Sequence, residues 1–460
     1  MLREESRSHA GAAISSPDAS YPLVRFADDS QIVGFRSQRP ISRRQFLSDV
    51  AALAGLLPAQ RYIVNLCTDR YRFMVGFAAA LCRDQISLMP PNDTPGMLTA
   101  LASDYGDVYA LVDTTRAPLP SVLYPETLEA RSKAEAMAVP VLPANQCAVI
   151  LFTSGSTGRP KPVPKSWGVL VRSALSAGDR LGIGDFAGGA VIGTVPHQHS
   201  YGLESVVFLA MQHGLSVIAE RRFYPADIHA AIAAAPQPRV LVTTPVHLRA
   251  LVAQASAMPK VDLIVSATAP LSAALAAQAE ACFSAPLLEI YGCTEAGQIA
   301  TRRTVCEAQW RCLDGVVLHQ QDGASWVEGA AVPSATPLQD IIERTGPDTF
   351  RLAGRSAELV DVAGKHTTIA HLNHQLLSIA GVKDGVFVMP EPDERRINRL
   401  AAIVVAPGLG ADAIRRGLRE RIDAAFLPRP LILVDSLPRN NLGKLPREAM
   451  LQFLRQNRIA

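Results

Sequence analysis

A short stretch in the first half of the chain gathers residue types that suit phosphate binding. An apolar run, Cys147 to Phe152, predicts a buried strand, and glycines and hydroxyl side chains follow it at once. Backbone that curls around glycines presents its N–H groups as a concave anion site, and a lysine adds positive charge. We predict a phosphate cradle here, before a helix that Ser166 caps. Its residues are Thr153, Ser154, Gly155, Ser156, Thr157, Gly158 and Lys161.

The spacing excludes a Walker-type phosphate loop, because G-x-x-x-x-G-K-[ST] is absent from this stretch. A surface turn rich in serine and glycine is the other interpretation, since short motifs also arise by chance. However, T-S-G-S-T-G-x-P-K, from Thr153 to Lys161, resembles the signature of the adenylate-forming superfamily. That superfamily holds acyl-CoA synthetases, aryl-acid ligases, luciferases and the adenylation domains of peptide synthetases. Pro162 stands where the family usually has glycine, and its fixed φ restricts the path by which the loop ends.

A second motif, Tyr291-Gly292-Cys293-Thr294-Glu295, follows the predicted strand Leu287 to Ile290 and matches the family's Y-G-x-T-E. The resemblance implies that Tyr291 lies against the adenine ring, for which an aromatic face is suited. It also implies that Gly292 lets the substrate pass close to the backbone, with Cys293 beside the acyl group. Thr294 is expected to bond the α-phosphate, and Glu295 to supply an oxygen ligand for Mg²⁺.

A predicted strand ending at Thr194 leads into Pro196-His-Gln-His-Ser-Tyr-Gly202. Histidines two residues apart share one face of a strand, so a metal pair is one interpretation, but no third ligand lies nearby in the sequence. A packed loop is another. The resemblance instead implies an acyl pocket, because the superfamily often has a histidine at this position of the motif. The acyl-binding candidates are His199, Ser200 and Tyr201.

Two further stretches complete the predicted nucleotide site. The strand Leu263 to Ser266 runs into a turn, and turns at the carboxyl ends of strands bind ligands in open α/β folds. The family's S-G-G-A-P-L turn borders the adenine, and Thr268, Ala269 and Pro270 are the candidates for this contact here. Ala267 and Thr268 stand where the family has its two glycines. Asp340 and Arg355 have the fifteen-residue separation of the family's ribose-binding pair. A carboxylate that accepts two hydroxyl groups makes a charge-assisted contact.

The C-terminal part of the chain resembles the family's small lid domain. At the hinge motif after Gly354, Ala357 replaces the usual aspartate or lysine. Gly364 lies in the predicted loop that enters the active site for thioester formation. Lys444, near the C-terminus, matches the lysine of the family's closing motif, which catalyses adenylation. The catalytic candidates that the resemblance implies are Lys444, Glu295 and Thr294.

The composition fits a soluble globular protein, since 48% of the 460 residues are hydrophobic and 19% are charged. No apolar stretch reaches the length of a membrane span, and residues 1–20 predict a loose tail without the apolar core of a signal peptide. Seven scattered cysteines without a Cys-x-x-Cys pair indicate free thiols in the reducing cytoplasm. A net charge of +3 argues against an extended surface for nucleic acid.

The positive charge gathers in the C-terminal part, where residues 355–460 hold sixteen Lys or Arg against eleven Asp or Glu. Arg415 and Arg419 lie one turn apart on a predicted helix, Asp412 to Phe426, and therefore share a face. A solvated helix is one interpretation. The other is a dock for an acidic carrier protein or for the phosphates of coenzyme A.

A chain of this length predicts two or more domains. Residues 40–90 alternate between helical and strand patterns, as in a layered α/β domain. The resemblance spans nearly the whole chain, from about residue 30, and implies an α/β fold with a large multi-subdomain N-terminal domain, residues 21–354. A small, mobile α+β lid domain, residues 355–460, is expected to follow it.

The resemblance implies ATP-dependent activation of a carboxylic acid as acyl-AMP, with Mg²⁺ bound, and then transfer to a thiol. The acceptor is coenzyme A or the phosphopantetheine of a carrier protein. A fatty acyl-CoA synthetase and a non-catalytic adenylate-binding protein are the alternatives. We exclude an α-amino acid, because Ser200 or Tyr201 replaces the carboxylate that would hold its ammonium, and an unpaired buried ammonium is costly. Residues 61–91 resemble ligases of aryl-polyene pathways, which favours a hydroxyaryl acid such as 4-hydroxybenzoate.

Overall fold

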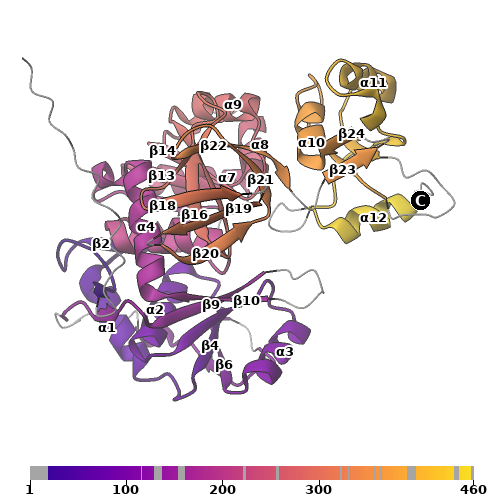
Figure 1. Ribbon diagram of the computed structural model, residues 1–460. Coiled ribbons are helices and arrows are strands. Elements are labelled where there is room, and N and C mark those ends of the chain that lie inside the picture. Colours follow the sequence, from indigo (N-terminus) through magenta and orange to yellow (C-terminus); the bar gives the residue numbers. More distant parts are fainter. Residues whose placement is uncertain are drawn as a thin grey trace, which may run out of the picture.

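The computed structural model describes most of the chain and contains strands and helices in alternation. The described residues are 19–114, 117–128, 137–153, 161–220, 224–254, 258–321, 324–329, 331–355, 359–362, 365–390, 400–439 and 445–456. Two large sheets dominate the larger part of the molecule, and a smaller group of elements lies beside them (Figure 1). This arrangement agrees with the predicted α/β class.

The first sheet has the strand order β10-β9-β5-β4-β6-β7 within the described residues. Its neighbours are parallel except for β9 and β10, which form an antiparallel hairpin. The short strands β1 (Ser20–Pro22) and β8 (Val141–Pro143) pair separately. The strands of the first sheet are β4 (Tyr62–Asn65), β5 (Ile86–Met89), β6 (Val108–Val112), β7 (Ser121–Leu123), β9 (Cys147–Thr153) and β10 (Lys161–Ser166).

The second sheet has the order β21-β22-β17-β16-β15-β14-β13-β11-β12-β2-β3 over the same described ranges. Its middle is parallel, from β15 through β14, β13, β11 and β12 to β2, and both ends are antiparallel. Its strands are β2 (Ile32–Arg36), β3 (Arg39–Ser42), β11 (Ala190–Gly193), β12 (Ser216–Ile218), β13 (Arg239–Thr243), β14 (Leu263–Ser266), β15 (Leu287–Cys293), β16 (Gly297–Arg302), β17 (Trp310–Cys312), β21 (Asp340–Arg344) and β22 (Thr349–Arg355).

Helices cover both outer faces of the two sheets and fill the space between them. The inner helical layer consists of α1 (Arg43–Ala54), α2 (Arg70–Cys82), α4 (Trp167–Leu181), the π-helical turn η3 (Leu203–Phe208) and α6 (Leu209–His213). The first sheet carries α3 (Pro95–Tyr105) on its outer face. The second sheet carries α7 (Pro225–Ala234), α8 (Pro245–Ala253) and α9 (Ala273–Phe283). Short helical turns are η1 (Glu126–Leu128), η2 (Ile183–Phe186) and α5 (Ser200–Gly202).

The parallel strands are buried on both faces because their side chains alternate between two cores. In β13, Val240 and Val242 face the inner layer, and Leu241 faces the outer helices. The inner layer is rich in aromatic rings, and Phe208 lies 5.9 Å from Trp167 and 5.4 Å from Phe77 between ring centroids. The three side chains are almost inaccessible to solvent. Continuous apolar runs are therefore correctly predicted as fully buried strands.

The C-terminal elements form a smaller unit around a sheet of the order β25-β26-β27 in its described part. One face packs on α10 and α11, and the other packs on α12. Figure 1 shows these elements on one side of the two large sheets. Their bounds are β23 (Leu359–Val362), β24 (Lys365–Thr368), α10 (Ile369–Leu377), β25 (Asp384–Val388), β26 (Ala401–Val405), α11 (Ala411–Arg419), η5 (Ala424–Phe426), β27 (Leu431–Leu433) and α12 (Arg447–Gln456). A further ladder joins β18 (Val316–Gln321), β19 (Ala324–Gly329) and β20 (Val332–Leu338).

Two local predictions need correction. The helix expected from Asp412 to Phe426 ends at Arg419, because Asp423 caps a separate turn by accepting a bond from the N–H of Ala425. No strand was predicted between the phosphate loop and the helix that Ser166 caps, but β10 lies there. The prolines at 162 and 164 obscured this strand, and it tolerates them because β10 is the edge strand of its sheet.

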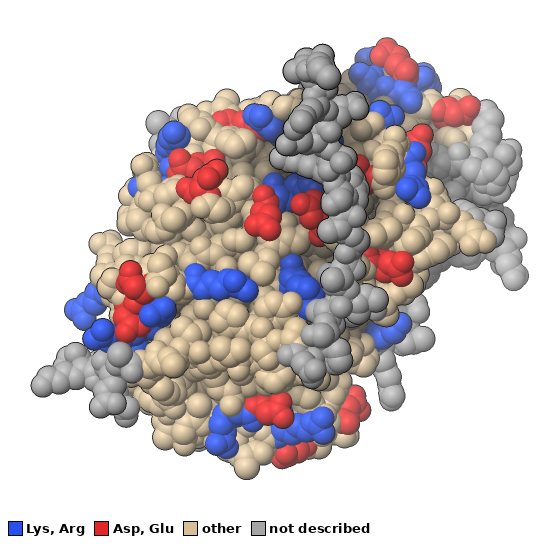
Figure 2. All heavy atoms as spheres, turned by 60° about the vertical axis from the view of Figure 1, so that its left-hand side comes forward, with Lys and Arg blue, Asp and Glu red and all other residues tan. Residues whose placement is uncertain are grey.

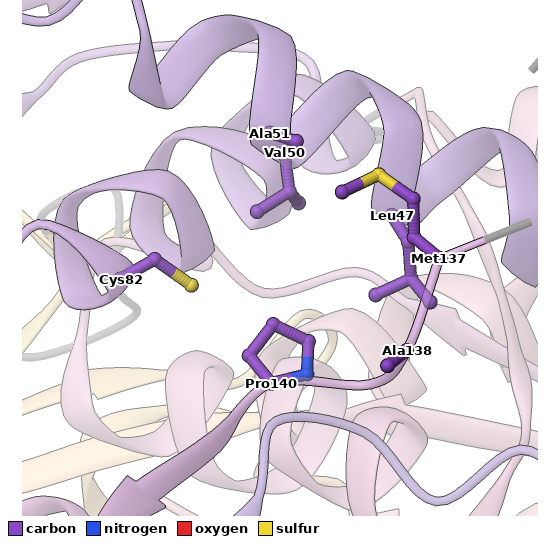
Figure 3. A pocket seen from close by; sticks show the side chains of 7 residues that line it. All are labelled: Leu47, Val50, Ala51, Cys82, Met137, Ala138 and Pro140. Carbon is purple, nitrogen blue, oxygen red and sulfur yellow. The ribbon is translucent and has the colours of Figure 1, made fainter. Parts of the chain in front are cut away.

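Within the described residues, an apolar cavity lies away from the predicted site. It has a volume of about 140 Å³ between α1, the end of α2 and the chain before β8 (Figure 3). Its lining is Leu47, Val50, Ala51, Cys82, Met137, Ala138 and Pro140. On the face in Figure 2, positive and negative side chains alternate with broad uncharged areas. No helix within the described residues has both the length and the apolar character that crossing a membrane requires.

Candidate active site

The parallel strands of the second sheet end at one edge, and the predicted site motifs follow them. The 196–202 motif comes after β11, the 267–270 turn comes after β14, and the 291–295 motif lies at the end of β15. Because β11, β13, β14 and β15 run parallel, their carboxyl ends meet at the same edge of the sheet. The fold therefore brings the adenine, phosphate and acyl candidates to one place.

The predicted phosphate loop closes a hairpin. Thr153 and Lys161 are register partners at the open end of β9 and β10, so the two ends of the loop lie side by side. The loop residues Ser154, Gly155, Ser156, Thr157 and Gly158 lie outside the described residues. Lys161 is exposed. Ser166 caps α4 as predicted, because its Oγ accepts a hydrogen bond of 3.4 Å from the backbone N–H of Val169.

The predicted base-binding tyrosine and ribose-binding aspartate are in direct contact. The Tyr291 hydroxyl donates a hydrogen bond of 2.7 Å to Oδ2 of Asp340. The tyrosine ring packs edge-on against Phe350 and lies tilted against Trp310, with centroids 5.6 Å apart in both cases, and this packing fixes the direction of the hydroxyl. Asp340 is also the register partner of Arg355 in the β21–β22 hairpin. The fifteen-residue separation seen in the sequence is thus the length of one closed hairpin.

The turn after β14 keeps a glycine-like backbone without glycine. Thr268 has φ +79°, in the left-handed region that a β-branched residue rarely adopts. Thr268 and Pro270 are exposed at the edge of the sheet, and Ala269 is partly buried. Threonine therefore replaces the family's glycine at this place but keeps a backbone conformation that suits glycine. This conformation stores backbone strain at the predicted adenine border.

The two histidines of the 196–202 motif have different surroundings. His197 is buried, with Nε2 at 2.9 Å from the carbonyl of Cys67 and its ring 4.5 Å from that of Phe73. His199 is partly exposed and precedes α5 as its N-cap residue. The packed-loop interpretation thus holds for His197. The interpretation of His197 and His199 as a pair of metal ligands finds no support, because Nε2 of His197 contacts a backbone carbonyl. Among the described residues, no three His, Cys, Asp or Glu side chains gather as a metal site.

Tyr201 uses its hydroxyl to tie the motif to the sheet. Its Oη lies 3.1 Å from the carbonyl oxygens of Thr243 and Val265, at the ends of β13 and β14. Burial raises the pKa of the Tyr201 phenol well above its ordinary value. The tyrosine therefore offers a ring face to a ligand, because its one proton is already donated to the backbone.

Ser200 contacts a carboxylate that the sequence prediction missed. Its Oγ donates a 2.8 Å hydrogen bond to Oε1 of Glu204, and Ser173 Oγ lies 3.2 Å from Oε2 of the same carboxylate. Glu204 is buried in η3. A glutamate in the apolar run Leu203 to Leu209 was the signal that could have revealed it, because isolated charges in such runs are rarely without a partner.

Lys165 is a second missed residue. It lies in β10, buried, and its ammonium donates a short hydrogen bond to the backbone carbonyl of Glu295. Burial lowers the pKa of Lys165, and the nearby carboxylates of Glu204 and Glu295 act in the opposite direction. The segment Lys161 to Ser166 was not recognised as a strand. Had it been, Lys165 would have stood out as a lysine at an inward-facing position.

The 291–295 motif forms a tight turn between β15 and β16. A Cβ on Gly292 would lie 2.2 Å from the carbonyl oxygen of Gly297, so the close approach of the partner strand requires glycine there. This is a reason other than the passage of substrate. Burial raises the pKa of the Cys293 thiol to about 11, which keeps it neutral. The side chain of Glu295 is exposed at the edge, and Thr294 is partly exposed.

Three further candidates are not placed. Ala357, Gly364 and Lys444 lie outside the described residues. The strands on either side of Gly364, β23 and β24, form a hairpin in which Val362 and Lys365 are register partners. Arg439, just before the segment of Lys444, makes two hydrogen bonds to Asp384, of 2.7 and 2.9 Å. Domain bounds at 354 and 355, the hinge and the roles of these residues stay predictions.

The β9–β10 hairpin of the first sheet and the motifs at the carboxyl edge of the second sheet are arranged as expected for an enzyme of the adenylate-forming type. The chain belongs to the AMP-binding enzyme family, whose pattern matches residues 59–321. It is 32% identical over 299 residues to a 4-coumarate–CoA ligase of Rhodobacter capsulatus, covering 64% of this chain and 74% of the relative. It is 22% identical over 441 residues to a 4-hydroxybenzoate–CoA/benzoate–CoA ligase of Rhodopseudomonas palustris, covering 86% and 80%.

A solved structure agrees with the fold. The ATP-bound MatB of Rhodopseudomonas palustris superposes with a TM-score of 0.80 at 19% identity, over 94% of this chain and 97% of that one. The predictions of the superfamily, of the α/β fold class and of an AMP-forming acid–thiol ligase are therefore confirmed. The chain is an enzyme of that class, which adenylates an acid with ATP and forms a thioester.

Proposed function

We propose that the protein activates a hydroxyaryl acid, of which 4-hydroxybenzoate is the model, and transfers it to a thiol. The observation that carries the substrate class is the bond between Ser200 and Glu204. The serine gives its only proton to the carboxylate, so toward a ligand its oxygen can only accept a hydrogen bond. A phenolic hydroxyl is a donor, and a benzoate or fatty acid without a hydroxyl leaves this acceptor unused.

The nucleotide half of the proposal rests on side chains that are oriented before ATP binds. Tyr291 holds the carboxylate of Asp340, which we assign to the ribose hydroxyls. In this proposal Thr268, Ala269 and Pro270 border the adenine, and the paired strand ends at Thr153 and Lys161 lie next to the phosphates. Pre-oriented groups of this kind align the acid's carboxylate with the α-phosphate and screen the repulsion between two anions.

The donor set at the turn suits Mg²⁺. Glu295 presents one exposed carboxylate, and Thr294 beside it adds a hydroxyl. Mg²⁺ is commonly held by one or two carboxylates together with phosphate oxygens and water, so a complete protein cage is not needed. When bound there, the ion offsets the charge of the phosphates. Lys444 supplies a second positive charge to the same phosphates in this proposal.

An α-amino acid fits the acyl site poorly. Glu204 is the carboxylate next to the motif, and its oxygens already accept bonds from Ser200 and Ser173. The ammonium of Lys165 lies near that carboxylate, so a substrate ammonium would meet a like charge. This supports the prediction from the sequence that amino acids are not activated.

ATP–pyrophosphate exchange with a panel of aryl, fatty and amino acids tests the proposal. We expect 4-hydroxybenzoate and 4-coumarate to support exchange, and benzoate to do so more weakly. A wide preference for medium-chain fatty acids would replace the aryl proposal with the fatty acyl alternative. No exchange with any acid would favour a binding protein without catalysis.

The acceptor is the second part of the proposal. Coenzyme A is favoured by the relatives that are named CoA ligases. A carrier protein, as in the aryl-polyene ligases that residues 61–91 resemble, is supported by the exposed Arg416 and Arg419 on α11. Arg415 on the same helix is partly neutralised by Asp412 at 3.2 Å. Comparing thioester formation on coenzyme A with that on an acidic carrier protein separates the two acceptors.

A further inference from the structure

A buried polar cluster lies beneath the candidate active site and joins three of its parts. Lys165 belongs to the strand after the phosphate loop, and Glu204 belongs to the π-helical turn after the acyl motif. Both line a narrow crevice with Ser173, Ala296 and Gly297 that leaves no room for a water molecule. The crevice is therefore not a ligand site, and its polar groups act on each other.

One contact in the cluster reaches the turn that we assign to Mg²⁺. The ammonium of Lys165 donates to the backbone carbonyl of Glu295, the residue whose side chain we assign to Mg²⁺. This bond crosses 130 positions in the sequence and fixes the peptide that follows Glu295 to β10. A hydrogen bond from a charged donor inside the protein is shorter and stronger than one between neutral groups.

Glu204 explains how a charged lysine is tolerated there. Its carboxylate is buried and lines the same crevice as Lys165. Each of its oxygens accepts a hydrogen bond from one serine hydroxyl. Gly297 permits this packing, because a Cβ would lie 3.2 Å from Oε2 of Glu204 and its φ is +83°. The acyl motif, the phosphate hairpin and the turn that we assign to Mg²⁺ thus border one buried crevice that holds two opposite charges.

We propose that Lys165 is a positioning residue for the adenylation step, which holds the Thr294–Glu295 turn at the place where MgATP binds. The inference rests on the proposed function, because it takes Glu295 as the metal-binding carboxylate. Lys165 touches neither ATP nor the acid in this proposal. Its effect passes through the backbone of Glu295, and the negative charge of Glu204 in the same crevice favours the charged ammonium.

The test compares Lys165→Met with the double variant Lys165→Met/Glu204→Gln. The single variant leaves Glu204 buried without its positive neighbour, so its stability falls for a reason unrelated to positioning. The double variant removes that charge as well and should regain most of the thermal stability. Lys260→Met is the matched control, since that lysine is exposed and only its backbone carbonyl accepts a bond.

Both half-reactions are measured on the full-length chain with 4-hydroxybenzoate. We expect the single and the double variant to lose about 100-fold in the rate of pyrophosphate exchange, the loss that displacement by 1 Å can cause. In the single variant, which keeps the bond between Ser200 and Glu204, the Michaelis constant for the acid should stay near that of the unchanged protein. Thioester formation from supplied acyl-adenylate should proceed normally in both variants. Full exchange activity in the double variant would overturn the proposal, because Lys165 would then serve only to neutralise Glu204.

Calorimetry of nucleotide binding separates this inference from the proposed function. ATP is titrated with Mg²⁺ present and again with the ion removed by a chelator. Lys165→Met should lose most of the gain in affinity that Mg²⁺ gives the unchanged protein, whatever acid the enzyme uses. An unaltered gain would overturn the role of Lys165. Absence of exchange with 4-hydroxybenzoate in the unchanged protein would instead overturn only the proposed acid.

Discussion

Tyr291 and Asp340 lie 49 positions apart and share a hydrogen bond of 2.7 Å. The bond joins the end of β15 to the start of β21, across strands that are not neighbours in the sheet. A phenol has one proton, so its donation to the carboxylate sets the direction of both groups. The predicted adenine and ribose contacts therefore form one unit and not two separate ones.

Tyr291→Phe should weaken the binding of ATP with little effect on folding. The ring keeps its packing against Trp310 and Phe350, but Asp340 loses the donor that orients it. A hydrogen bond to a charged group contributes about 1.5 kcal/mol or more, so the Michaelis constant for ATP should rise about 10-fold. Pyrophosphate exchange at varied ATP measures this. Tyr224→Phe, at an exposed tyrosine, is the control, and an equal change in both variants would contradict the assignment.

Thr268→Gly should stabilise the protein or leave its stability unchanged. Threonine in the left-handed region costs about 1–2 kcal/mol, and glycine adopts φ +79° without that cost. Glycine also makes the unfolded chain more flexible, which offsets up to about 1 kcal/mol of the gain. Urea unfolding gives the difference in free energy. A loss above 1 kcal/mol would show that the threonine side chain makes a contact that outweighs the strain.

Ser200→Ala should reduce the preference for 4-hydroxybenzoate over benzoate. The variant removes the acceptor that we assign to the ring hydroxyl, and a hydrogen bond contributes about 0.5–1.5 kcal/mol. The ratio of kcat/KM between the two acids should therefore fall about 3- to 10-fold. Ser173→Ala is the matched control, because it removes the other donor to Glu204 outside the acyl motif. An unchanged ratio in Ser200→Ala would reject the assignment.

Gly202→Ala should destabilise the protein before it affects chemistry. A Cβ at this position would lie 2.0 Å from the carbonyl oxygen of Pro196, which is backbone and cannot rotate away. Crowding of this kind costs about 1–3 kcal/mol in the free energy of unfolding. Gly184→Ala serves for comparison, since nothing lies within 4 Å of its added Cβ. Equal stability of the two variants would mean that the 196–202 motif can shift as a whole.

Lys444→Ala and a large substitution at Gly364 should affect opposite half-reactions. If Lys444 offsets the charge that grows on the α-phosphate, its loss should slow pyrophosphate exchange about 10²- to 10³-fold. Transfer from supplied acyl-adenylate should continue at nearly the normal rate. Gly364→Trp should block the thiol and spare exchange. Equal damage to both steps in Lys444→Ala would contradict a lid that alternates between two positions.

Buried strands were predictable because each has an apolar run of strand length. β14 agrees residue for residue with the predicted range, and β9 and β15 begin at the predicted residues. The cap of α4 was equally local, and Ser166 accepts the bond that the pattern predicts. β10 was missed because two prolines normally argue against a strand, and only its place at the edge of the sheet makes them acceptable.

Candidate residues could be predicted where they belong to one continuous motif. Contacts between two distant segments could not be predicted. The motifs around Tyr291 and Thr153 are local, and the sequence shows them. The link from Lys165 to Glu295 joins residues 130 positions apart, and no periodicity in either segment indicates it. The carboxylate of Glu204 was overlooked in part for the same reason, since one of its two partners, Ser173, lies in α4.

The position of α2 has a consequence for how the two large sheets come apart. This helix contacts β4 and β5 of one sheet and β12 of the other, and it is buried from Arg70 to Leu81. The guanidinium of Arg70 donates to the carbonyls of Gly193 and Ile218 in the second sheet. Neither sheet can leave without exposing this helix and breaking these bonds. The two sheets therefore melt together in one cooperative transition, although each alone has the strand count of an ordinary domain.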